Sequence, residues 1–199
     1  MRKLAVCIAA VAVLWGCMSS PVRRFYQIQL TGNRAEGLQP IQRTLRVDPV
    51  SVDDLYDDFR ILYRVSPFEV NFYSYGFWAD KPGKLVGDAI SHYLAGHNLF
   101  AGVTRTVTGP DPDIVLKSRI HVIEEIDEPD FWHGRLAMSL EFLEYPSDLA
   151  LHTHTFDRTE KLPGKDVAHL PAVISQILEE ELARAVSALA RKIVDPPDR

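Results

Sequence analysis

The feature that most constrains the fold is a pair of long alternating stretches at residues 114–126 and 132–142. Five apolar side chains share one parity in each stretch, and Glu128-Pro129-Asp130 separates the two as a turn. In the first stretch they are Ile114, Leu116, Ile120, Val122 and Ile126, and in the second they are Trp132, Leu136, Met138, Leu140 and Phe142. Alternation over this length predicts two antiparallel strands with one face on a core and the other in water. A third strand at 149–158 would continue the meander. The solvated face of the first strand is expected to carry Lys117, Arg119, His121 and Glu125.

Two other segments carry the periodicity of amphipathic helices. In residues 81–97 the apolar side chains form one stripe, Pro82 suits the first turn, and Asp80 is the expected N-cap. Residues 167–193 carry a longer stripe, and Asp195-Pro196-Pro197 ends it.

Shorter β-rich segments precede the long strands, and two of them look like a hairpin around Ser66-Pro67. The whole pattern predicts an α+β fold, in which a mostly antiparallel β-sheet has two amphipathic helices packed on one face. These short segments are residues 25–30, 44–47, 60–65, 68–73 and 99–107.

The N-terminus has the pattern of a bacterial export signal. Arg2 and Lys3 precede an uncharged apolar run over residues 4–15. As a helix that run would span roughly 18 Å, which is short of a hydrocarbon core of about 30 Å. Leu14-Trp15-Gly16-Cys17 resembles the lipobox of bacterial lipoproteins. An uncleaved anchor, or an ordinary secretory signal with a chance cysteine, is the alternative.

The lipobox predicts three parts of the chain. Residues 1–16 would be the lipoprotein signal peptide, residues 17–24 the lipidated cysteine and its tether, and residues 25–195 a single domain. Cys17 would carry the acyl chains, palmitate among them, and Cys7 would leave with the signal. The mature chain would then hold no free thiol, which excludes cysteine nucleophiles and cysteine metal sites.

The net charge argues against a nucleic-acid partner. The chain carries 22 Lys and Arg against 27 Asp and Glu, a formal charge of −5. Binding to nucleic acid needs clustered cations that replace condensed counterions.

Met18, rather than an aspartate, follows Cys17. In a Gram-negative host this resembles a lipoprotein sent to the outer membrane.

Catalytic and metal-binding motifs are absent from the sequence, which has no nucleophile elbow, Walker A motif or zinc spacing. His152 and His154 share one face of a strand, and we expect that face to be solvated. The acidic set Asp53, Asp54, Asp57 and Asp58 lacks the ligand pattern of a calcium loop. The carboxylates between Glu124 and Asp130 could form a docking patch or a solvated turn. We therefore expect no enzyme, no cofactor and no metal.

An aromatic cluster is the best candidate for a partner or ligand surface. Tyr75, Phe77 and Trp78 lie close together before the first helix. Aromatic anchors dominate many interfaces, and a core beneath the helix explains the same residues.

Several short motifs occur in the order found in one known family. They are Phe25-Tyr26-Gln27-Ile28-Gln29-Leu30, Asp48-Pro49-Val50, Ile61-Leu62-Tyr63-Arg64, Phe77-Trp78-Ala79-Asp80-Lys81-Pro82 and Asp113-Ile114-Val115-Leu116. With the lipobox and the C-terminal helix, they resemble the ABC-type transport auxiliary lipoproteins, including the PqiC-like members.

The resemblance implies a non-catalytic protein anchored in the outer membrane and facing the periplasm. Its implied partners are an MCE-domain protein and an ABC permease–ATPase complex, which moves lipid or other apolar compounds across the envelope. The protein would dock or stabilise the transport bridge, and it could form a homo-oligomer. A lipoprotein that binds lipid or another apolar ligand on its own is the alternative.

Overall fold

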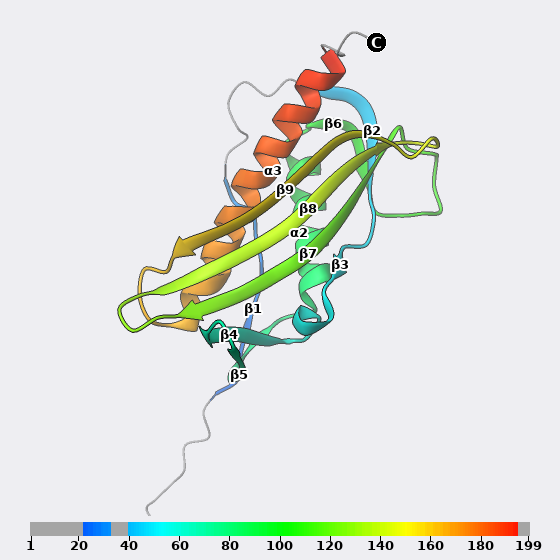
Figure 1. The fold of residues 1–199 in the computed structure, drawn as a ribbon. Coiled ribbons are helices and arrows are strands. Elements are labelled where there is room, and N and C mark those ends of the chain that lie inside the picture. The colour runs from blue at the N-terminus through cyan, green and yellow to red at the C-terminus, as the bar shows by residue number, and fades with distance from the viewer. Residues whose placement is uncertain (1–21, 33–39, 195–199) are drawn as a thin grey trace, which may run out of the picture.

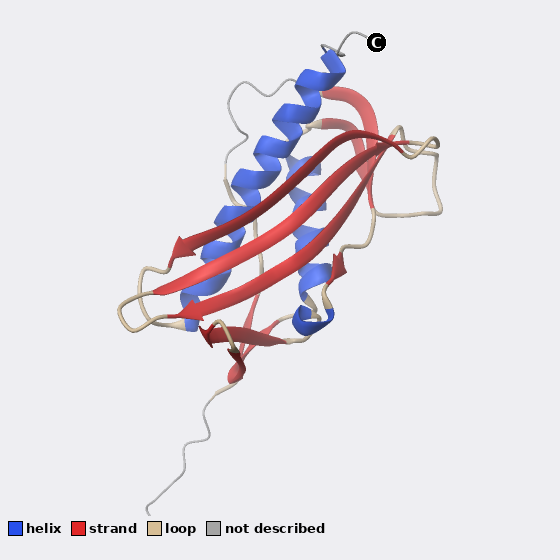
Figure 2. Ribbon diagram, in the orientation of Figure 1, coloured by secondary structure: helices blue, strands red, loops and turns tan. Residues whose placement is uncertain are grey.

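The computed structural model describes residues 22–32 and 40–194 (Figures 1 and 2). The predicted signal peptide 1–16 and Cys17 lie outside the described residues. The strands are β1 (Arg24–Tyr26), β2 (Ile41–Val47), β3 (Ser51–Val52), β4 (Arg60–Ser66), β5 (Glu69–Trp78), β6 (Phe100–Thr104), β7 (Ile114–Asp127), β8 (Trp132–Glu144) and β9 (Leu149–Lys161). The helices are α2 (Pro82–Gly96) and α3 (Leu170–Val194), with short 3-10 turns η1 (Asp54–Tyr56) and η2 (Val167–His169).

The sheet is built around β7. On one side β7 pairs antiparallel with β8, which in turn pairs antiparallel with β9, as the alternation predicts. On the other side β2, β3 and β4 each pair with β7 in parallel. The α+β prediction and its long antiparallel strands are confirmed. The sheet is a mixed one, because β2, β3 and β4 pair with β7 in parallel. Parallel strands need long crossover connections, and alternation within a single strand does not reveal them.

Both helices cover the same face of the long strands (Figure 2). Gly134 lets α3 approach β8 closely, since a Cβ there would lie 3.0 Å from the side chains of Leu170 and Val173. Buried residues of α2, α3 and the sheet form one core. The predicted covering of one face by two amphipathic helices is therefore confirmed.

Several element boundaries differ from the prediction, and two of them concern residues singled out in the sequence. Lys81 is the N-cap of α2, and the Asp80 carboxylate only accepts a hydrogen bond from the Lys81 amide at 2.8 Å. The first strand ends at Tyr26 instead of Leu30. Beyond it, the Gln29 amide donates to Ser175 Oγ of α3 at 3.1 Å. A side chain of α3 has replaced a neighbouring strand as the hydrogen-bond partner of this segment.

A β-bulge at His121 changes which residues of β7 face the core. Ile120 lies opposite Met138, but Val122 already lies opposite Ala137, so one residue of β7 has no counterpart. An extra residue reverses the alternation beyond it. Glu125 lies opposite Gly134 and therefore faces α3, and none of its surface is exposed. The prediction of a solvated Glu125 is wrong for this reason.

Candidate functional site

The predicted aromatic surface is divided between core and solvent. Trp78 is only 2% exposed and packs in the core, so it is not a surface residue. Phe77 is half-buried and stacks on Phe25, with ring centroids 5.6 Å apart. Tyr75 is 47% exposed. Of the three predicted residues, Tyr75 is the one that the structure leaves exposed.

Tyr75 lies beside an open hollow of about 580 Å³ that we call the tyrosine hollow. The irregular stretch of β5 between its two registers with β4 forms part of the wall. Tyr63 and Tyr73 meet with ring centroids 4.7 Å apart. The hollow is lined by Val22, Arg24, Tyr26, Tyr63, Phe72, Tyr73, Ser74, Tyr75, Gly76 and Val167.

A buried carboxylate, Glu125, is bonded to one wall of the tyrosine hollow. The Tyr73 hydroxyl donates to Glu125 Oε1 at 2.5 Å. Within the described residues, Glu125 Oε2 and the buried hydroxyl of Tyr26 have no hydrogen-bond partner. Burial raises the pKa of Glu125 to about 7, and the nearby charges of Asp127 and Asp166 act in the same direction. The Tyr73 hydrogen bond opposes this rise.

The neighbouring Glu124 is equally buried and points to the opposite face of β7. Arg64 donates to both carboxylate oxygens, at 3.0 and 2.9 Å. The Tyr56 hydroxyl donates at 3.0 Å, and Arg135 contributes a longer contact of 3.4 Å. Its hydrogen bond to Glu124 raises the pKa of Arg64. Arg64, the last residue of the third motif, thus ties the β4–β5 hairpin to the centre of the sheet.

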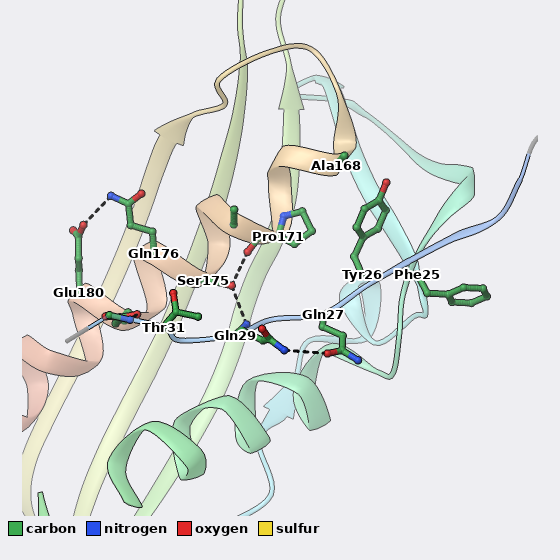
Figure 3. A pocket seen from close by; sticks show the side chains of 13 residues that line it. Phe25, Tyr26, Gln27, Gln29, Thr31, Ala168, Pro171, Ser175, Gln176 and Glu180 are labelled. Atoms are coloured by element: carbon green, nitrogen blue, oxygen red, sulfur yellow. Dashed lines mark hydrogen bonds between the residues drawn. The ribbon is translucent and has the colours of Figure 1, made fainter. Parts of the chain in front are cut away.

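A second open hollow, of about 770 Å³, lies between the extended segment 25–32 and α3 (Figure 3). Its polar atoms already bond one another. Ser175 Oγ accepts from the Gln29 amide and donates to the Pro171 carbonyl at 2.7 Å, and Glu179 accepts from the Gly32 amide at 2.9 Å. These contacts hold the N-terminal segment against α3.

His152 and His154 lie on the face of β9 that packs against α3, so the prediction that this face is solvated is wrong. Both point towards α3, where His154 Nε2 lies 2.8 Å from Glu181 Oε2. His152 stacks on Phe142 at 6.5 Å, and burial lowers its pKa. Arg158 and Arg184 also bond Glu181, at 3.2 and 2.5 Å. A carboxylate that already binds two guanidinium groups is a poor cation ligand.

Five of the acidic residues singled out in the sequence are either paired with basic side chains or buried in the interior. Throughout residues 22–32 and 40–194, no three His, Cys, Asp or Glu residues gather as a metal site would require. Glu124 and Glu125 are buried, so the proposed acidic patch near the β7–β8 turn lacks both of them. The ion pairs of the first acidic set are Asp53 with Arg119, Asp57 with Lys81 and Asp58 with Arg60.

Neither described helix combines the length and the apolar character that a transmembrane span needs. Both are amphipathic, and their apolar stripes are buried against the sheet. Their packing is therefore explained by the domain's own core.

Comparison with known proteins supports the family suggested by the motifs. The sequence pattern of the ABC-type transport auxiliary lipoprotein component matches residues 26–187. No curated protein sequence matches the chain.

Solved structures share the fold at low sequence identity. Protein XCC0632 from Xanthomonas campestris, of family DUF330, is 17% identical with a TM-score of 0.73, over 86% of this chain and 95% of that one. The hypothetical protein CT253 from Chlamydia trachomatis is 9% identical with a TM-score of 0.51, over 74% and 98% of the two chains. At these identities the likeness concerns the fold alone.

Proposed function

The chain belongs to the ABC-type transport auxiliary lipoprotein family, and from that premise we propose that it holds the outer-membrane end of an envelope transport bridge. In this proposal Cys17 carries the acyl chains, and the domain faces the periplasm. Its partners are an MCE-domain protein and an ABC permease–ATPase complex. The protein performs no chemistry itself.

One observation carries the proposal. The family pattern extends over residues 26–187, almost the whole described domain, and begins nine residues after the lipobox-like Cys17. Anchoring confines a docking protein to the membrane surface and so raises its effective concentration near a partner. A subunit with this role needs no nucleotide site, because the ATPase supplies the energy.

Affinity capture from the host tests the proposed partners. We expect a C-terminally tagged full-length protein to recover an MCE-domain protein after crosslinking in intact cells. Deletion of the gene should raise envelope permeability to apolar dyes, and the wild-type gene should restore it. Recovery of no transport component, together with unchanged permeability, would overturn the proposal.

The variant Cys17→Ser tests the anchor separately. This change removes the predicted acylation site and leaves every described residue intact. We expect the variant protein to leave the membrane fraction and to fail in restoring the permeability barrier. Full complementation by a released protein would contradict the anchored docking role.

The tyrosine hollow favours a second candidate, in which the domain itself binds an apolar ligand. Its aromatic walls and the nearby buried Glu125 suit a ligand with an apolar body and a hydrogen-bonding group. Native mass spectrometry of delipidated protein with added phospholipid measures this directly. A Tyr75→Ala variant should lose bound lipid, whereas an absence of lipid on the wild-type protein rejects this candidate.

A further inference from the structure

Exposed apolar side chains gather on one part of the molecule. Phe68, at the turn between β4 and β5, is 99% exposed. Six of the ten large hydrophobic residues that are exposed in the described chain lie on β1, on the β4–β5 hairpin, or directly beside them. We call these six the apolar end, and they are Val22, Phe25, Phe59, Val65, Phe68 and Tyr75.

The apolar end is also the end at which the described chain begins. Figure 1 shows β1, β4 and β5 together at the lower end of the molecule, far from the turn that joins β8 to β9. Cys17 precedes Val22 by five residues, which span at most roughly 18 Å when fully extended. Acyl chains on Cys17 would therefore hold this end, and not the opposite one, near the bilayer.

Cationic side chains accompany the aromatic rings at the apolar end. The Arg60 guanidinium lies 4.2 Å from the centroid of the Phe72 ring, and the Arg23 guanidinium lies 5.7 Å from that of Phe77. Aromatic rings with neighbouring arginines are typical of the interfacial zone of a bilayer, where the rings meet acyl chains and the cations meet phosphate groups.

We propose that the apolar end is a membrane-contact surface that lies in the lipid interface of the bilayer carrying the protein's own anchor. The proposal rests on the anchoring part of the proposed function and adds the orientation of the domain. Phe68 and its neighbours enter the boundary between headgroups and acyl chains. The turn between β8 and β9 then points away from the membrane.

Tryptophan reporters in the full-length lipidated protein test this orientation. Phe68→Trp places a reporter on the apolar end. Leu149→Trp is the matched control, because Leu149 is also largely exposed, at 63%, but begins β9 at the far end. Both proteins are placed in phosphatidylethanolamine and phosphatidylglycerol vesicles with plain or brominated acyl chains. The unsubstituted protein gives the background from its own tryptophans.

Bromine quenches only tryptophans that lie close to the acyl chains. We expect the Phe68→Trp signal to fall about twofold in brominated vesicles, as an interfacial depth of about 5–10 Å implies, while the Leu149→Trp signal stays unchanged. Vesicle-bound protein with neither reporter quenched would overturn the inference and leave the anchor standing. The same result is expected if a second copy or a protein partner covers this surface.

A failed anchor has a different signature. If mass spectrometry finds no acyl chains on Cys17, the anchored function fails, and the same reporters then measure direct partitioning into the vesicles. Quenching of Phe68→Trp alone still supports a membrane-contact surface. No quenching at either position rejects it.

Discussion

Glu124 and Glu125 are adjacent in β7 and equally buried, yet they lie in opposite electrical surroundings. On one face of the sheet, Glu124 meets two arginines and a tyrosine hydroxyl. On the other face, Glu125 has the Tyr73 hydroxyl as its hydrogen-bond donor, and two further carboxylates lie nearby. Burial of a carboxylate is tolerated in both ways, by compensating its charge or by keeping its proton.

The comparison explains what each face of β7 does for the domain. The compensated face joins β4, β7 and β8 through charged hydrogen bonds. The uncompensated face lies between the tyrosine hollow and α3, and the raised pKa of Glu125 there predicts that stability depends on pH. The experiments below remove one partner at a time and run from the largest expected effect to the smallest.

Removing Arg64 should break the compensated face. Arg64→Ala leaves the buried Glu124 carboxylate with only Tyr56 and the longer Arg135 contact, so we expect a loss of about 3 kcal/mol in the free energy of unfolding. Urea denaturation of the purified protein measures it. Arg60→Ala on the same strand is the control, since Arg60 pairs with Asp58 in solvent and should contribute little. Equal effects of both changes would refute the buried network.

Glu125 should make the folded state less stable as the pH rises. Its pKa of about 7 when folded exceeds the ordinary value of 4.5, so the folded state binds the extra proton. The stabilisation is complete below pH 4.5 and is lost as the pH rises through 7, a loss on the order of 2–3 kcal/mol. Urea unfolding at pH 5 and pH 8 measures the difference. Glu125→Gln should flatten this part of the profile, and an unchanged pH slope in that variant would contradict the assignment.

The smallest expected effect concerns the hydroxyl that supports Glu125. Tyr73→Phe removes the hydrogen bond that lowers the pKa of Glu125, so that pKa should rise further. Stability at pH 8 should fall by about 1 kcal/mol. NMR titration of the glutamate side-chain carbons follows the pKa itself. Tyr63→Phe, which leaves the Tyr73 hydroxyl in place, should not move it.

The sequence predicts the long strands and both helices because their patterns repeat over many turns or many residues. The same reasoning fails near His121, because β7 has one extra residue there relative to β8. Alternation within β7 alone does not reveal this bulge. The one local sign of the change is the pair of adjacent glutamates between Ile123 and Ile126, which interrupts the alternation of apolar and polar residues.

Contacts between distant segments lie beyond sequence reasoning of this kind. Arg64 bonds Glu124, which is 60 residues away in the chain. The order of the motifs therefore identified this arginine, but the sequence did not show which residue it binds. Trp78 and Tyr75 look alike in the sequence, and only the packing of β5 makes one a core residue and the other a surface residue. The same holds for Glu181 of α3, which supplies the carboxylate that His154 lacks locally.

The central position of β7 also bears on how such a protein could reach the cell envelope. A secreted chain crosses the membrane with its N-terminus first, so β2, β3 and β4 emerge before the strand with which all three pair. Such non-local pairing is slow to form. In an exported chain, we expect β2, β3 and β4 to lack their partner β7 until it has followed, so the order of the strands would favour completion of the sheet on the far side of the membrane.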